Sequence, residues 1–98
     1  MPDLLPGWLP WCDMCAEAQS TQELQELLEL FLTDEERAAI AGRYRVIQAL
    51  LLGKESQRQI AASQGVSIAT ITRGSNQLKR IDPKLKSILL SYFKNQDG

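Results

Sequence analysis

The chain has 98 residues, 44% of them hydrophobic and 23% charged, with a formal net charge of −1, which is ordinary for a globular domain. No apolar stretch approaches the roughly 18 residues of a membrane span, and residues 1–10 lack the basic and apolar segments of a signal peptide. With two cysteines and no export signal, we expect a cytoplasmic protein of one domain, residues 1–98, with no membrane partner. A core this small would be enlarged by pairing with a second copy.

Charge is divided sharply along the chain. Residues 1–36 hold nine acidic side chains and no Lys or Arg, whereas residues 37–98 hold all eleven basic side chains against three acidic ones, a net of +8. A basic half that faces phosphate while an acidic half turns away is typical of nucleic-acid-binding proteins. Charge also varies along proteins that bind no nucleic acid, so this asymmetry alone carries modest weight.

The N-terminal residues 1–32 predict two amphipathic helices. Three prolines and a glycine indicate an irregular start, with Pro10 suited to the first turn of a helix. One face of the first helix is then predicted to carry Trp8, Trp11, Cys12 and Cys15, which have helical spacing. A second such face follows within Thr21–Leu32, in Leu24, Leu27, Leu28 and Phe31. Both apolar faces require a partner to cover them.

Residues 33–53 predict the longest helix. Thr33 and Glu36 have the spacing of a capping box, in which each side chain binds the other's backbone N–H. Gly53 is suited to end the helix in the left-handed conformation. We expect its buried stripe to consist of Ile40, Tyr44, Ile47 and Leu51.

Residues 56–79 match the pattern of a helix-turn-helix. Ser56 and Gln59 form a second capping box before a short helix, Gln57–Gln64, and Gly65 supplies the left-handed residue of a tight turn. Ser67 caps the next helix, which runs from Ile68 to about Lys79. Ala61 is small where the helices cross, Val66 fills the angle between them, and we expect two core anchors, Ile60 and Ile71. An ordinary helical hairpin, which also favours glycine at its turn, is the alternative.

The exposed residues of this segment are candidates for DNA binding. In a helix-turn-helix the second helix enters the major groove with its N-terminus first. We therefore expect contacts to base edges or phosphates from Gln57, Arg58, Ile68, Ala69, Thr70, Thr72 and Lys79. Few of these are long donors on the second helix, so either Gln57 and Arg58 read the bases or water and DNA shape carry specificity.

A last helix is predicted over residues 82–94. Asp82 is suited to its N-cap and Pro83 to its first turn. Its apolar positions are Leu85, Ile88, Leu89 and Tyr92. No segment predicts a strand, so the expected class is all-α, with about six helices.

From Leu28 to Phe93 the sequence resembles the Trp operon repressor family. The residues that carry the resemblance are Leu32-Thr33-x-x-Glu36-Arg37, Gly42-Arg43-x-Arg45, Leu50-Leu51-x-Gly53, Ser56-Gln57-Arg58 and Ile68-Ala69-Thr70-Ile71-Thr72-Arg73-Gly74-Ser75-Asn76-x-Leu78-Lys79. The resemblance implies an intertwined homodimer of six-helix subunits in which residues 1–32 and 82–94 build a shared core. The Trp repressor is itself among the proteins on which helix-turn-helix docking and water-mediated readout were described, so both points come with the resemblance.

The resemblance also implies L-tryptophan as a corepressor and double-stranded operator DNA as a partner. Arg43 and Arg73 would flank the indole, because a flat guanidinium stacks on its π-face, and Arg73 would also pair with the carboxylate. The partner subunit would supply the backbone carbonyls of Leu30 and Leu32 to the ammonium. The remaining ligand residues would be Thr33, Thr70, Gly74 and Gln77. Without the resemblance, a surface ion pair for Arg43 and a phosphate contact for Arg73 would be the simpler interpretations.

Several alternatives stay open. Gln77 stands where well-known family members have a serine, which leaves room for a regulator of the same fold that binds DNA without tryptophan. The acidic balance and the apolar N-terminal face also fit a helical protein-interaction module. The Cys12-x-x-Cys15 pair lacks the βαβ setting of a redox motif and the further ligands of a zinc site. With no histidine and no phosphate-binding or nucleophile motif, we expect no enzyme, no metal and no cofactor.

Overall fold

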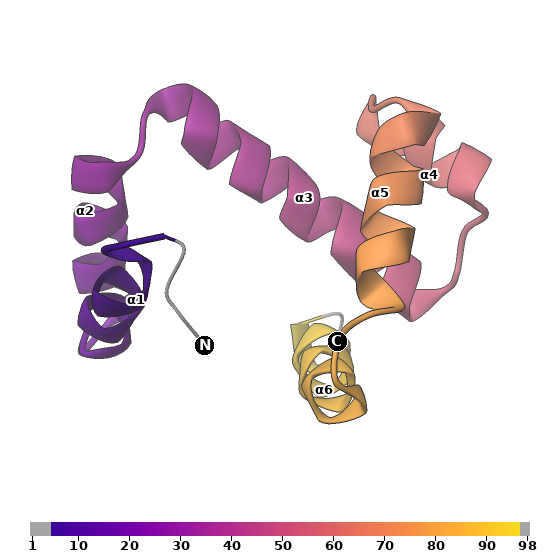
Figure 1. Cartoon of the computed structure of the whole chain (residues 1–98). Helices are drawn as coiled ribbons and strands as arrows, with labels where there is room; N and C mark the ends of the chain where they lie inside the picture. The colour runs from indigo at the N-terminus through magenta and orange to yellow at the C-terminus, as the bar shows by residue number, and fades with distance from the viewer. Residues whose placement is uncertain (1–4, 97–98) are drawn as a thin grey trace. The chain divides into compact units, whose positions relative to one another are not determined.

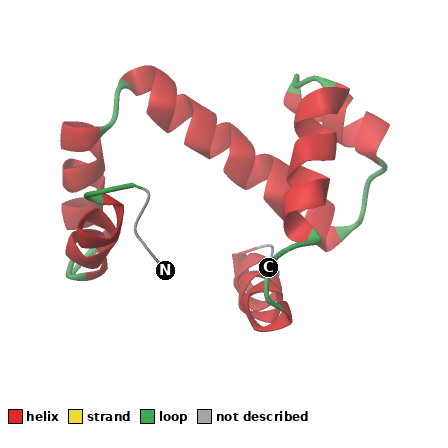
Figure 2. Cartoon of the chain, viewed as in Figure 1, coloured by secondary structure: helices red, strands yellow, loops and turns green. Residues whose placement is uncertain are grey.

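The computed structural model describes residues 5–96, which form six α-helices and no strand (Figures 1 and 2). The helices are α1 (Trp8–Ala16), α2 (Thr21–Phe31), α3 (Asp34–Leu52), α4 (Gln57–Gln64), α5 (Ile68–Leu78) and α6 (Pro83–Gln96). The predicted all-α class with six helices is therefore confirmed. Within residues 5–96, none of the helices is long and apolar enough to cross a membrane.

The chain divides into two compact units, residues 1–38 and 39–98, and each is described by itself. The first contains α1, α2 and the start of α3. Trp8 and Trp11 stack with ring centroids 5.4 Å apart, and Phe31 of α2 meets Trp11 edge-on at 6.3 Å. Neither α1 nor α2 has a fully buried residue, and Leu30 is 77% exposed. These two helices therefore leave much of their apolar surface uncovered within the first unit.

The ends of α3 follow the local signals in the sequence. The backbone N–H of Thr33 donates to Glu36 Oε1 at 2.8 Å, and that of Glu36 donates to Thr33 Oγ1 at 3.1 Å, so the predicted capping box is present. Asp34–Glu36 place negative charge in the first turn, where the helix dipole favours it. After Leu52, Gly53 takes a φ of +67°, which is the left-handed conformation that favours glycine.

The predicted buried stripe of α3 was wrong in part. The buried residue of this helix is Val46, at 3% exposure, whereas Ile40 and Tyr44 are 50% and 42% exposed. Ile47 and Leu51 are half-buried. Helical periodicity predicts which residues share a face but not which face the neighbouring helices cover, and α4 and α5 pack against the side that carries Val46.

The core of the second unit lies where α3, α4 and α5 meet. Ile60 and Ile71 are completely buried beside Val46, and the residues packed against them include Ala61 and Val66. Gly65 ends α4 with a φ of +67°. The Ser67 hydroxyl then caps α5 by accepting from the backbone N–H of Thr70. The predicted turn and both isoleucine anchors are thus confirmed.

The last helix begins as predicted and ends later. Asp82 accepts a hydrogen bond from the backbone N–H of Lys84 at 2.7 Å, and the helix continues to Gln96 rather than ending at residue 94. Its buried residue is Phe93, which meets Tyr44 edge-on with centroids 5.5 Å apart. The expected apolar face is about half exposed at Leu85, Ile88 and Tyr92.

Candidate functional site

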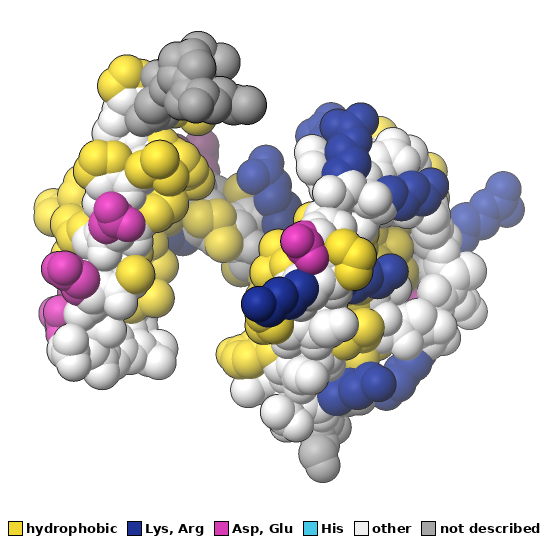
Figure 3. Space-filling model, turned by 60° about the horizontal axis from the view of Figure 1, so that its bottom comes forward, with side chains coloured by type: hydrophobic (Ala, Val, Ile, Leu, Met, Phe, Trp, Pro, Cys, Tyr) yellow, Lys and Arg dark blue, Asp and Glu magenta, His cyan; other side chains and the backbone are white. Residues whose placement is uncertain are grey.

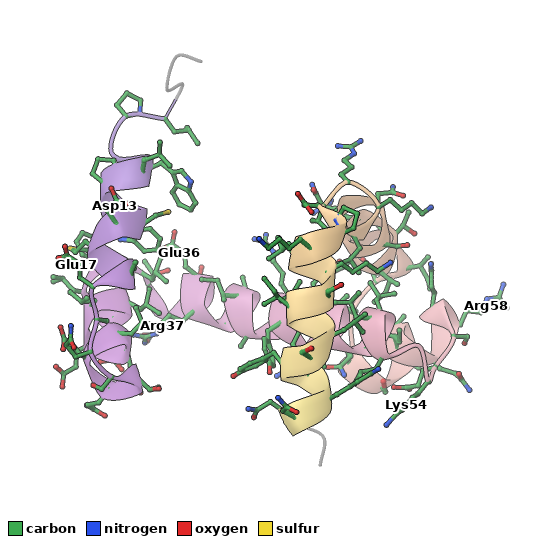
Figure 4. The ribbon with its side chains drawn as sticks, turned by 90° about the horizontal axis from the view of Figure 1, so that it is seen from below. Asp13, Glu17, Glu36, Arg37, Lys54 and Arg58 are labelled. Atoms are coloured by element: carbon green, nitrogen blue, oxygen red, sulfur yellow. The ribbon has the colours of Figure 1, made fainter. Side chains whose placement is uncertain are left out.

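One candidate surface is the outer face of α4 and α5. Six of the seven predicted DNA-binding residues are exposed there, namely Gln57, Arg58, Ile68, Ala69, Thr72 and Lys79. The seventh, Thr70, is half-buried, and its hydroxyl lies 3.0 Å from that of Ser67. Arg58 projects away from α4 into solvent (Figure 4). The start of α5 is therefore not packed inside the protein, and a macromolecule can reach it.

This surface belongs to a strongly basic unit. Described residues 39–96 contain ten Lys and Arg side chains and two acidic ones, Glu55 and Asp82. The space-filling view shows lysine and arginine side chains spread over this unit (Figure 3). Such an excess of positive charge attracts the phosphates of nucleic acid at long range.

A second candidate site is a cleft between α3 and α5, within the second unit. Its volume is about 300 Å³, at the lower end of the roughly 300–1,000 Å³ of small-molecule sites. Its lining residues come from two helices: Arg43, Val46 and Ile47 from α3, and Thr70, Arg73, Gly74 and Gln77 from α5. Five of the eight residues predicted to hold L-tryptophan are thus brought together. The apolar walls formed by Val46 and Ile47 were not predicted.

The charge in this cleft is positive. Arg43 and Arg73 are exposed, and within residues 5–96 neither side chain pairs with an acidic one. No carboxylate lines the cleft. Both guanidinium groups therefore remain available to stack on a ring or to pair with the carboxylate of a ligand. An apolar wall beside two free cations suits a flat aromatic molecule that carries a carboxylate.

Gly74 lies where α5 packs against α3. A Cβ atom at this position would lie 3.4 Å from Leu50 Cδ1 and 3.4 Å from Val46 Cγ1. These distances are at the short end of ordinary van der Waals contact, so an added methyl group would touch both side chains of α3. The resemblance pointed to Gly74 as a ligand residue, and its contact with α3 was not predicted.

The other three predicted ligand residues lie in the first unit. Leu30 belongs to the last turn of α2, whose carbonyl groups lack partners inside the helix. Leu32 is half-buried, and the Thr33 hydroxyl is engaged in the cap of α3. The structure therefore leaves Leu30 able to accept a hydrogen bond while assigning Thr33 a structural bond.

The two cysteines lie on one helix of the first unit. Cys12 and Cys15 are free thiols, each half-buried on α1. Across the described part of the chain, no three His, Cys, Asp or Glu side chains gather so that they could hold a metal ion.

Comparison with known proteins identifies the family. The family described as "Trp repressor protein" matches residues 6–92. A Trp operon repressor homolog of Chlamydia trachomatis is 49% identical over 83 residues, which cover 85% of this chain and 88% of the relative. The homologs of Photobacterium profundum and Vibrio cholerae are 39% and 43% identical, over 91% and 74% of this chain and 86% and 70% of their own lengths. The chain therefore belongs to the Trp repressor family, a family of transcription regulators, as the sequence motifs predicted.

Proposed function

We propose that the protein is a tryptophan-dependent repressor of genes for tryptophan biosynthesis or transport. It binds a palindromic operator as an intertwined homodimer, through a helix-turn-helix made of α4 and α5. The observation that carries the proposal is the cleft lined by Arg43 and Arg73, because the helix that forms one of its walls also presents the exposed residues Ile68 and Thr72. A ligand in the cleft thus touches the element that would read DNA.

In this proposal the indole lies against Val46 and Ile47, between the guanidinium groups of Arg43 and Arg73. Arg73 also pairs with the ligand carboxylate, in a charge-assisted hydrogen bond. The side-chain carbonyl of Gln77 accepts from the ammonium group, to which the partner subunit's Leu30 and the partner subunit's Leu32 also offer backbone carbonyls.

The start of α5 enters the major groove, as in the helix-turn-helix proteins among which the Trp repressor is counted. Ile68 and Ala69 contact thymine methyl groups, and Thr70 and Thr72 bind base edges directly or through water. The remaining contacts, to phosphates or to the edge of the site, come from Gln57, Arg58 and Lys79. In the homodimer the two α5 helices occupy successive grooves, about 34 Å apart.

Exposed apolar surface supports the homodimer. α1 and α2 contain no fully buried residue, and α6 leaves Ile88 57% and Tyr92 51% exposed. Large apolar patches on a single chain mark a surface that another protein covers. If α1, α2 and α6 were buried against a second copy, the two copies would share one larger apolar core.

The proposal is tested by the binding of duplex DNA with and without L-tryptophan. A duplex selected by the protein from a random pool serves as operator, and an unrelated duplex of equal length is the control. At fixed salt, saturating L-tryptophan should raise operator affinity by roughly 5- to 150-fold, the usual range of allosteric coupling. The affinity for the unrelated duplex should change far less.

Two results would contradict the proposal in different ways. Selection of an operator whose affinity ignores tryptophan would favour a regulator that binds DNA without this ligand, the alternative that Gln77 raises. Failure to bind any duplex in a salt-dependent manner would favour a protein-interaction module instead.

A further inference from the structure

The second unit has another cleft that shares no residue with the first. It has a volume of about 340 Å³ and lies where the end of α3, the start of α4, the end of α5 and the start of α6 approach one another. Its lining residues are Leu50, Leu51, Gln57, Ser75, Leu78, Lys79 and Lys86. Two of them, Gln57 and Lys79, are predicted DNA-binding residues, whereas Lys86 of α6 is not.

Every polar side chain in this cleft can donate a hydrogen bond. Lys79 and Lys86 carry ammonium groups, Ser75 a hydroxyl and Gln57 a primary amide, and no carboxylate lines the cleft. The other walls are leucine side chains. A cleft with two cations, two neutral donors and an apolar floor suits a phosphate group attached to a sugar.

The start of α4 adds to this positive character. Gln57 is the first residue of this helix, where the dipole favours an anion. Ser56 caps the N–H of Gln59, whereas within residues 5–96 the backbone N–H groups of Gln57 and Arg58 have no hydrogen-bond acceptor. Asp82, the acidic residue nearest to Lys86 in the sequence, caps α6 by binding the N–H of Lys84 and does not line the cleft.

We propose that this cleft binds a backbone phosphate of duplex DNA, and that Lys86 extends the DNA contact from α4 and α5 onto α6. The inference rests on the DNA binding of the proposed function but not on its dependence on tryptophan. It adds a residue outside the helix-turn-helix. The predicted contact does not depend on base sequence, because phosphates carry no base information.

The test compares Lys86→Gln with Lys84→Gln, which makes the same charge change on the same helix at a residue outside the cleft. The affinity of each variant is measured against salt, for the operator and for an unrelated duplex. Loss of one phosphate contact lowers the slope of log affinity against log salt by about 0.9, and by about twice that in a homodimer. We expect this drop for Lys86→Gln on both duplexes, and little change of slope for Lys84→Gln. Unchanged circular dichroism and tryptophan affinity would show that Lys86→Gln is folded.

Three results would overturn the inference. They are an unchanged slope for Lys86→Gln, an equal drop for both variants, and a drop confined to the operator. Binding to the unrelated duplex does not require tryptophan. The salt slope for that duplex therefore tests the inference even where tryptophan proves not to control operator binding. Absence of any duplex binding by the unsubstituted protein would overturn both this inference and the proposed function.

Discussion

Gly74→Ala tests whether the contact between α3 and α5 forms the wall of the ligand cleft. Two effects of the substitution are favourable to stability, because alanine is preferred over glycine inside a helix by about 0.8–1.0 kcal/mol and an added buried methyl group contributes about 0.8 kcal/mol. Close contacts of 3.4 Å with Leu50 and Val46 oppose them. Overpacking costs about 1–3 kcal/mol, so we expect the free energy of unfolding to change by less than about 1.5 kcal/mol.

The effect on the ligand should be larger. The cleft holds only about 300 Å³, and a methyl group at Gly74 takes space beside Val46 and Ile47. If the bound ligand meets the same overpacking cost of about 1–3 kcal/mol, its dissociation constant rises roughly 5- to 150-fold. Urea denaturation measures the first quantity and calorimetric titration with L-tryptophan the second.

Gly42→Ala is the matched control. Gly42 also lies inside a helix, α3, but a Cβ atom there meets nothing within 4 Å among the described residues. This variant should gain up to about 1 kcal/mol in the free energy of unfolding and bind tryptophan normally. The reasoning would be refuted if Gly74→Ala left tryptophan affinity unchanged, or if both variants lowered it equally.

Three further substitutions give sharp expectations. Ile71→Ala empties a completely buried site and should lower the free energy of unfolding by about 2–5 kcal/mol in urea denaturation; a loss below 1 kcal/mol would contradict its place in the core. Gly65→Ala forces a side chain into a φ of +67° and should cost about 1–2 kcal/mol, whereas no loss would show that the turn has another conformation. Arg73→Ala should leave stability within about 0.5 kcal/mol but weaken tryptophan binding roughly 10- to 150-fold by calorimetry, and an effect on duplex affinity alone would reassign Arg73 to phosphate contact.

The sequence predicted well those features that depend on a few neighbouring residues. The caps at Thr33, Ser56 and Ser67 and the glycine turns after α3 and α4 are all present. Each is a local arrangement of a short polar side chain, or of a glycine, around backbone groups within one helical turn. Such signals do not depend on what the rest of the chain does.

The burial of each helix face could not be predicted in the same way. Val46 and Phe93 are buried without having been expected in the core, and Ile40 and Tyr44 are more exposed than their spacing suggested. Burial depends on which neighbour covers a face, and periodicity carries no information about that neighbour. The exposed apolar residues of α1, α2 and α6 show the same limit, because neither unit covers them by itself.

Five residues of the cleft between α3 and α5 were predicted from resemblance rather than from spacing. Arg43 and Arg73 lie far apart in the sequence, and only the packing of α5 on α3 brings them to one cleft. The same packing adds Val46 and Ile47 as walls, which no motif indicated. Lys86 was not predicted for the same reason. Only the packing of α6 in the second unit brings it to the cleft that Gln57 and Lys79 also line.

The central claim is that L-tryptophan occupies the cleft between α3 and α5, and nuclear Overhauser effects between ligand and protein test it most directly. Protein carrying labelled methyl groups is saturated with unlabelled L-tryptophan, and contacts to the indole protons are recorded. We predict strong contacts to the methyl groups of Val46 and Ile47, which line the cleft beside Arg43 and Arg73. Contacts confined to methyl groups elsewhere, such as those of Leu51 and Leu78 in the second cleft, would contradict the account.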